Sequence, residues 1–390
     1  MNLTNILGKL IHPLILKSLK NLPINIKLPN GKFISNDSVK EITVYEWSTF
    51  WDILWAYDIG FSHAYLKGKW DTDDLPGIFE LLSQTNNNEY SIVSGFALGK
   101  IPSIISQRIR SSNSIKSAPK NIQDHYDLSN DFFKGFLDKS MTYSSAMFSE
   151  ETKTLHDGQL KKIDNLLNKA KIKKESSILD IGCGWGGLIT RASKQFDCQV
   201  TGITLSKNQY QFSQELISEL SAESKVSVEL KDYRLINQKF DHIFSVEMLE
   251  AVGHKGINEF FHKCSQILNN EGTLQIQVII IPDERYEIYR KNCDFIQKFI
   301  FPGGLLPSLQ YIEESAKSYG FKITEKISLR TDYAKTLEYW SENLSKNWNS
   351  LDELGFSEID FRKFQYYFAY CQGAFTSGHI DNIQLSFSRQ

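Results

Sequence analysis

The second half of the chain repeats one pattern, in which an apolar run is followed by a turn and then by a segment with helical spacing. The run "SSILDIG" leads into the glycine-rich "CGWGG" and then into the helical "LITRASKQF". The alternation continues through "QVTGITL", a helix from Lys207, "KVSVELKD", "FDHIFSVEML", a helix at 256–269 and "TLQIQVIII". Strands that alternate with helices predict a mostly parallel sheet with helices on both faces. We therefore expect an α/β fold with a doubly wound sheet.

The N-terminal part follows a different pattern. Residues 24–82 alternate short β-like runs such as "KFISN" with a longer helical run, "TFWDILWAYDIGFSHAYLKG", and two polar stretches follow, "SQTNNNEYS" and "SQRIRSSNSIKSAPKN". A chain of 390 residues is also long for a single hydrophobic core. We expect a small N-terminal α+β domain with its linker over 1–115, and a larger domain over 116–390.

The first helical segment combines apolar residues at helical spacing with lysines, and Pro13 within it predicts two short helices or one kinked helix. Residues 1–36 hold five lysines and no acidic residue, and residues 90–123 hold five basic residues and no acidic one. These stretches are either solvated basic faces or surfaces attracted to anionic lipid headgroups, where each basic residue adds about 1 kcal/mol. Nucleic acid is not expected as a partner, because no recognition motif accompanies the charge. No apolar run approaches the ~20 residues that span a bilayer.

Composition indicates the kind of interior, the redox compartment and whether a metal site is expected. Aromatic residues make up 13% of the chain, which suits either a Phe-rich core or an apolar tunnel. The five cysteines are scattered without a CxxC pair, which predicts free thiols in the cytoplasm. No Cys/His cluster with zinc spacing is present, so no metal site is expected.

The turn after the first strand of the larger domain is the strongest chemical motif. In "LDIGCGWGG", Asp180 precedes Gly182 and Gly184, which permit a tight turn and close approach of the backbone to a ligand. The spacing differs from the dinucleotide fingerprint and resembles motif I of S-adenosylmethionine-dependent methyltransferases. After the third strand, Asp232 is placed to accept from the adenine amino group and Tyr233 to flank the ring, with Asp232 as a simple helix cap as the alternative.

Several segments in order resemble the cyclopropane-fatty-acyl-phospholipid synthases. They include "HYDLSNDFFKGFLDKSMTYSSAMF", "SVEMLEAVG", "KFIFPGGLLPS" and "YYFAYCQGAFTSGHIDNIQLSFSR", and the resemblance covers roughly residues 45–390. It implies a class I methyltransferase Rossmann-like fold with a helical, aromatic lipid cap. It also implies S-adenosylmethionine as cofactor and transfer of its methyl group to the double bond of an unsaturated acyl chain in a membrane phospholipid. A carbocation forms in that reaction, and a bound bicarbonate removes a proton from the new methyl so that the ring closes.

The resemblance also assigns roles to individual residues. The positions implied to contact the cofactor are Tyr143, Ser144, Gly182, Gly184, Thr204, Leu205 and Gln209. The positions implied to hold bicarbonate and abstract the proton are Glu250, Tyr333 and Ile279, together with Ser145 and Gln277, which stand where cyclopropane synthases have Cys and His. Ser can donate through its hydroxyl and Gln through its amide. Glu247, three residues before Glu250, is the other carboxylate that could face the cavity.

The two departures from the family pattern suggest a branch that methylates acyl chains without closing a ring, including precursors of furan fatty acids. Glu250 or a weakly held anion would then take a proton from a chain carbon. The alternatives are a genuine cyclopropane synthase, a methyltransferase for a small soluble molecule, and an inactive lipid-binding protein. The expected location is the cytoplasm, peripheral on the inner face of the membrane, and a homodimer is possible.

Overall fold

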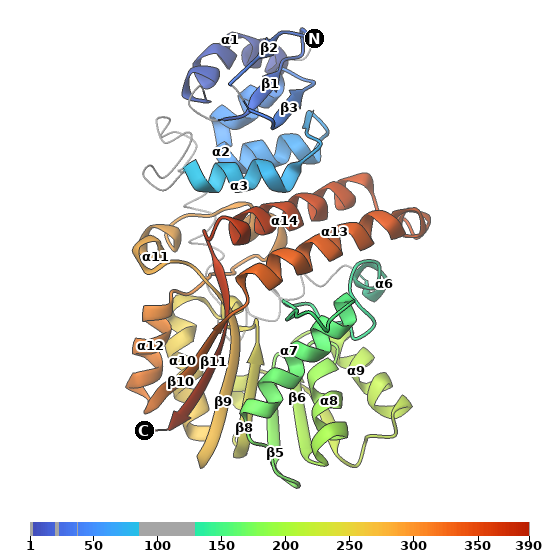
Figure 1. Ribbon diagram of the computed structural model, residues 1–390, viewed down its shortest axis with the longest axis vertical. Helices are drawn as coiled ribbons and strands as arrows, with labels where there is room; N and C mark the ends of the chain where they lie inside the picture. The colour runs from blue at the N-terminus through green and yellow to red at the C-terminus, as the bar shows by residue number, and fades with distance from the viewer. Residues whose placement is uncertain (1–2, 20–22, 37, 86–128, 390) are drawn as a thin grey trace.

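The computed structural model describes residues 3–19, 23–36, 38–85 and 129–389. The predicted domain boundary near residue 115 lies outside these residues. The chain has two units, a small N-terminal one at the top of Figure 1 and a larger one that contains the main sheet. Within the described part of the chain, no helix combines the length and the apolarity needed to cross a bilayer.

The N-terminal unit packs three helices against a small sheet. Its helices are α1 (Leu3–Leu19), α2 (Ser48–Leu66) and α3 (Leu75–Thr85), and its strands are β1 (Asn25–Lys27), β2 (Phe33–Ile34), β3 (Glu41–Val44) and β4 (Trp70–Asp71), in the order β2-β1-β3-β4. Pro13 lies inside a single helix, α1, so of the two expected forms, two short helices or one kinked helix, the first is not observed. The α+β character predicted for this region is observed.

The larger unit is the doubly wound sheet that the sequence predicts. Its strands are β5 (Ser177–Ile181), β6 (Gln199–Thr204), β7 (Val226–Leu230), β8 (Phe240–Val246), β9 (Leu268–Ile280), β10 (Phe321–Ser328) and β11 (Asp381–Arg389), in the order β10-β11-β9-β8-β5-β6-β7. Strands β5 to β9 run parallel, and β11 pairs antiparallel with both β9 and β10. The strand order reverses between β5 and β8, and ligands bind at such a point, beyond the carboxyl ends of the strands.

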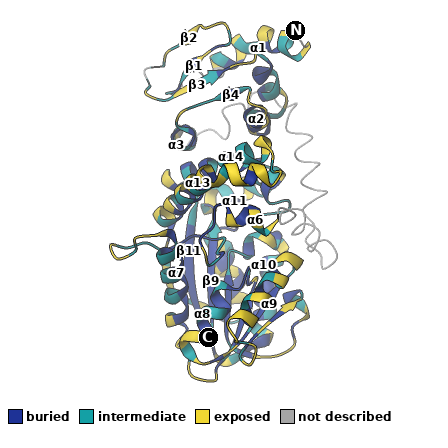
Figure 2. Cartoon of the chain, turned by 90° about the vertical axis from the view of Figure 1, so that its right-hand side faces the viewer, coloured by how far each residue is buried: buried dark blue, intermediate teal, exposed yellow. Residues whose placement is uncertain are grey.

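Helices cover both faces of this sheet, and its strands are mostly buried (Figure 2). They are α7 (Leu155–Lys169), α8 (Gly187–Phe196), α9 (Lys207–Glu219), α10 (Gly253–Ile267) and α12 (Leu309–Ser318). The predicted start of a helix at Lys207 is confirmed, because the Ser206 hydroxyl caps α9 by accepting from the backbone N–H of Gln209. The short elements are α6 (Asn130–Lys134), α11 (Asp283–Tyr289), the 3₁₀ turns η2 (Tyr233–Leu235) and η3 (Leu249–Ala251), and a π-helical turn, η4 (Ile296–Ile300).

Two long helices, α13 (Arg330–Glu353) and α14 (Glu358–Thr376), lie between the main sheet and the N-terminal unit (Figure 1). They are rich in buried rings, including Trp340, Phe364 and Phe368, and they form the helical, aromatic cap that was expected. Arg362 of α14 joins the two units, because its guanidinium donates to the carbonyls of Tyr65 and Trp70 and to the carboxylate of Asp71. We call this set of contacts the Arg362 joint.

Candidate active site

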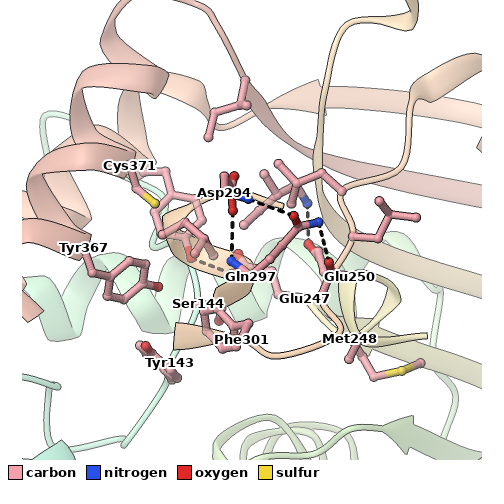
Figure 3. A pocket seen from close by; sticks show the side chains of 18 of the residues that line it. Tyr143, Ser144, Glu247, Met248, Glu250, Asp294, Gln297, Phe301, Tyr367 and Cys371 are labelled. Atoms are coloured by element: carbon pink, nitrogen blue, oxygen red, sulfur yellow. Dashed lines mark hydrogen bonds between the residues drawn. The ribbon is translucent and has the colours of Figure 1, made fainter. Parts of the chain in front are cut away.

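A cavity of about 760 Å³ runs from the carboxyl ends of β5 and β6, past the end of β8, and under α14. Its lining joins the glycine turn after β5 to residues of the cap and of the N-terminal unit. Figure 3 shows the middle of this cavity, where Tyr143, Ser144, Glu247 and Glu250 point toward a common space. Most residues assigned from sequence therefore line one cavity.

The glycine turn forms one end of the cavity. Gly182 has φ +84°, and a Cβ there would lie 2.9 Å from the Met248 side chain, so only glycine fits. Asp180 is 2% exposed, its Oδ1 has no hydrogen-bond partner, and burial raises its pKa to about 7. A buried acceptor of this kind fits a cationic ammonium group such as the one that S-adenosylmethionine carries.

The second and third strands supply polar groups to the same end. Thr204 donates its hydroxyl to Gln209 Oε1 at 2.8 Å, and both residues line the cavity with Leu205. Asp232 also lines it, but both of its carboxylate oxygens accept from the Arg234 guanidinium, at 2.8 and 2.6 Å. Asp232 also caps η2 by accepting from the Arg234 backbone N–H, so the helix-cap alternative describes its present contacts. Tyr233 is buried and lines the cavity beside it.

The segment before α7 brings Tyr143 and Ser144 over the glycine turn. The ring of Tyr143 packs against those of Phe133 and Trp340, with centroids 5.4 and 5.2 Å away. Ser144 accepts a hydrogen bond on Oγ from Lys162 Nζ at 2.5 Å. Lys162 is 1% exposed and lines the cavity, and burial lowers its pKa to about 8. Sequence reasoning missed this lysine, because nothing in the spacing of α7 distinguishes a buried ammonium from an exposed one.

The centre of the cavity holds the carboxylate of Glu247, which is surrounded by donors. Its Oε1 accepts from the backbone N–H of Ser145 at 2.9 Å, from Gln277 Nε2 at 2.8 Å and from Asn382 Nδ2 at 2.7 Å. Its Oε2 accepts from the Tyr333 hydroxyl at 2.7 Å. Every partner is placed to donate, so both oxygens of Glu247 act as hydrogen-bond acceptors.

The backbone at Glu247 is strained, with φ +51°, a region that non-glycine residues rarely adopt. This residue follows directly after β8, and its backbone N–H donates to the Gln277 carbonyl at 2.7 Å. The turn directs the side chain back toward Ser145 and Gln277. Strain of this kind is typical of functional sites.

The residues expected to hold bicarbonate make a different set of contacts. Ser145, Gln277 and Tyr333 all donate to Glu247, and the Ile279 backbone N–H donates to Glu250 Oε1 at 2.6 Å. The Ser145 hydroxyl donates to the Ala146 carbonyl at 2.9 Å, and its contact with an anion stays a prediction. The donor set expected for a free anion is thus directed largely at a carboxylate of the chain itself.

Glu250 lies beside Glu247 but has fewer hydrogen-bond partners. Its Oε1 accepts from Ile279, while its Oε2 is buried and has no hydrogen-bond partner. Burial, and then the charge of Glu247, raise the pKa of Glu250 to about 8. At neutral pH Glu250 is therefore mostly protonated, whereas both oxygens of Glu247 accept hydrogen bonds. The role of Glu250 as the proton acceptor stays a prediction.

This difference predicts how stability depends on pH. The folded-state pKa of Glu250, about 8, exceeds its ordinary value of 4.5, so the folded protein holds a proton that the unfolded chain releases. The stabilising contribution is complete below pH 4.5 and is lost as the pH rises to about 8. In Glu250→Gln this contribution is absent, so we expect the melting temperature of the wild type to fall by a few degrees relative to the variant between pH 5 and 8. Thermal unfolding of both proteins across this pH range measures the difference in melting temperature. Parallel curves of melting temperature against pH would contradict the prediction.

Sequence reasoning also missed a row of amides behind Glu247, which are buried except for the half-buried Asn165. Asn165 donates to Gln384 Oε1 at 2.5 Å, Gln384 Nε2 donates to Gln277 Oε1 at 3.0 Å, and Gln277 donates to Glu247. Asn382 is fully buried and donates to Glu247 directly. The row fixes the Gln277 amide with its NH₂ toward the carboxylate. The amide residues of β11 lie in "HIDNIQLSF", and only pairing with β9 reveals that they face Gln277.

Comparison with known proteins agrees with this geometry. The family model described as mycolic acid cyclopropane synthetase matches residues 113–385, which is more than half of the chain. Tuberculostearic acid methyltransferase UfaA1 of Mycobacterium tuberculosis is 35% identical over 343 residues, covering 85% of this chain and 79% of that protein. Cyclopropane mycolic acid synthase 1 of the same organism is 36% identical over 275 residues, covering 68% of this chain and 96% of the synthase.

Solved structures give the same result. The cyclopropane synthase MmaA2 from M. tuberculosis superposes with a TM-score of 0.66 at 34% identity, covering 70% of this chain and 98% of that one. The mycolic acid cyclopropane synthase CmaA1, solved with SAH and CTAB, superposes with a TM-score of 0.65 at 35% identity and the same coverage. The resemblance indicated by the sequence motifs and the class I methyltransferase fold are both confirmed, and S-adenosylmethionine is the cofactor. The chain belongs to the mycolic acid cyclopropane synthetase family and is an S-adenosylmethionine-dependent C-methyltransferase similar to the cyclopropane synthases.

Proposed function

We propose that this enzyme methylates a double-bond carbon of an unsaturated acyl chain in a membrane phospholipid and releases a methyl-branched unsaturated chain instead of a cyclopropane. The observation that carries the proposal is the position of Glu247. Its carboxylate accepts the hydrogen bonds that the family resemblance assigns to bicarbonate, from Ser145 N, Gln277 and Tyr333. The carboxylate of Glu247 thus takes the place of bicarbonate as the base.

S-adenosylmethionine, when bound at the glycine turn, supplies the electrophilic methyl group. Attack by the alkene forms a bond to that methyl as its bond to sulfur breaks, which leaves S-adenosylhomocysteine and a positive charge on the neighbouring chain carbon. Tyr143, Phe301 and Tyr367 line the cavity, and ring faces attract such a charge. Glu247 then accepts a proton from a chain carbon, and the C–H electron pair forms the new double bond. If the proton came from the added methyl, the same pair would close a ring.

The charge states of the two glutamates favour Glu247 as the base. Glu247 accepts hydrogen bonds on both oxygens, whereas the pKa of Glu250 is raised to about 8 and its Oε2 has no hydrogen-bond partner. A group that is mostly protonated at neutral pH accepts a proton only in its minor form. We therefore assign proton abstraction to Glu247 and treat Glu250 as its neutral neighbour.

The substrate class is supported by the outer surface of the N-terminal unit. Leu3, Leu10 and Leu14 of α1 are 66%, 70% and 58% exposed, and they form one stripe at helical spacing. Lys9 and Lys17 are exposed on the same helix. An exposed apolar stripe with lysines suits insertion into the interface of an anionic bilayer, which would bring the enzyme to its lipid as a peripheral protein. The relative UfaA1 is named as a methyltransferase, which agrees with a methylated product.

The product can be decided with deuterated cofactor. Purified enzyme is incubated with vesicles of a mono-unsaturated phospholipid and S-adenosylmethionine that carries a CD₃ group. Loss of a proton from a chain carbon leaves all three deuterons in the lipid, whereas ring closure removes one of them. We expect a product that retains three deuterons and still reacts with ozone. A product with two deuterons that resists ozone would identify a genuine cyclopropane synthase and overturn the proposal.

A further inference from the structure

The cavity does not end at the glutamates but continues into the N-terminal unit. Ile26 and Ile42 line it, and they are paired neighbours on the parallel strands β1 and β3, so both side chains face the same side of the small sheet. Ile24 and Ile53 line it as well. All four are buried, at 3 to 8% exposure. We call these four residues the isoleucine floor.

A polar section lies where the two units meet. Asp58 of α2 and Asp294, just before η4, both line the cavity. Both residues therefore contribute a carboxyl group to the same lining. Figure 3 shows Asp294 on the same cavity as Glu250 and Glu247. The lining therefore contains an apolar floor in the N-terminal unit, an acidic pair at the junction of the units, and an aromatic region near the reacting centre.

The isoleucine floor lies outside the part of the chain that the family model matches, which begins at residue 113. Cyclopropane mycolic acid synthase 1 matches 68% of this chain with 96% of its own length. The reacting centre is thus part of the shared domain, whereas the floor is an addition relative to that synthase. An apolar compartment that opens into the catalytic cavity is suited to hold an apolar part of the substrate, because burial of apolar surface is favourable.

We propose that the isoleucine floor receives the second, non-reacting acyl chain of a two-chain lipid. This inference rests on the proposed function, because it names the lipid class used at the same site. A lipid with two chains has a polar glycerol region between two apolar arms, and the cavity lining has the same three parts. The far end of the reacting chain is a poorer occupant, because its methylenes would have to pass two carboxyl groups.

The test uses lipids with one constant mono-unsaturated chain and a saturated partner chain of short, medium or long length. Ile42→Phe and Ile26→Phe each fill part of the floor, and Val39→Phe, at a 96% exposed position of the same unit, is the matched control. We expect the wild type and the control to prefer the long partner chain. For the lipid with the long partner chain, we expect the floor variants to lose at least about tenfold in kcat/KM, since overpacking blocks a chain of full length. For the lipid with the short partner chain, we expect their kcat/KM to stay at the wild-type value.

The other outcomes overturn the inference. Equal losses for all partner lengths would place the reacting chain in the floor, and no loss in either variant would leave the floor without a substrate role. Activity on the short-partner lipid shows that methyl transfer itself is intact, so failure here is distinguishable from failure of the proposed function. Circular dichroism and binding of S-adenosylmethionine identify a variant that has lost its fold, and Ile42→Leu, which conserves volume, should then behave as wild type.

Discussion

Replacement of Glu247 by glutamine is expected to lower kcat by ~10²–10⁴-fold, the range for loss of a positioned general base. The amide keeps the size of the side chain but cannot accept the proton from the acyl chain. Binding of S-adenosylmethionine should be almost unchanged, because the glycine turn and Asp180 are not altered. Single-turnover assays and calorimetry on the same preparation measure the two effects.

Glu250→Gln is the matched control for this experiment. The amide resembles the protonated acid that Glu250 mostly is at neutral pH, given its raised pKa of about 8. We expect this variant to keep kcat within about tenfold of the wild type, well short of the loss of a general base. If Glu250→Gln lost turnover while Glu247→Gln kept it, the proton would go to Glu250 and our assignment would be wrong.

Glu247→Gly is expected to lose turnover and to regain it when bicarbonate is added. Glycine suits the φ of +51° at this position, and removal of the side chain leaves Ser145 N, Gln277 and Tyr333 as donors around a space for a small anion. We expect bicarbonate to raise the rate by about an order of magnitude or more, a fraction of the effect of a native base. The rescued product should shift toward the cyclopropane.

The rescue has two controls. Sodium chloride at equal ionic strength should not restore activity, and the wild type should show no dependence on bicarbonate in degassed buffer. Product identity is read with the CD₃-labelled cofactor, as for the wild type. A wild-type rate that falls when bicarbonate is removed would show that Glu247 does not replace the anion.

The sequence predicted the architecture of the larger unit because its strands are continuous apolar runs that end in recognisable turns. The strand in "SSILDIG" and the helix from Lys207 were predicted from local spacing, and β5 and α9 begin at Ser177 and Lys207. Strand β9 was expected from "TLQIQVIII", but it begins earlier, at Leu268, because its pairing with β8 extends to Phe240. Pairing between distant segments is not encoded in local spacing.

The centre of the site was predictable only in part for the same reason. Gln277 and Tyr333 could be named from motifs, yet their hydrogen bonds converge with that of Asn382 on Glu247, near the ends of β8, β9 and β11. Glu250, also named from a motif, accepts from Ile279 instead. The strained turn at Glu247 decides which carboxylate faces the donors. That turn depends on the Gln277 carbonyl, which is 30 residues away in the chain. The sequence indicated two candidate glutamates, and the fold distinguishes them.

The Arg362 joint has a consequence for the fidelity of the reaction. Its guanidinium holds the carbonyls of Tyr65 and Trp70 and the carboxylate of Asp71 against α14, above the cavity. A carbocation is captured by any water that reaches it, and enclosure of the site prevents that side reaction. A loosened joint would let water enter between the units, and a methylated alcohol would form beside the alkene. A variant with a weakened joint would therefore first show a larger fraction of methylated alcohol among its products. A lower turnover rate would appear only when the joint is weakened further.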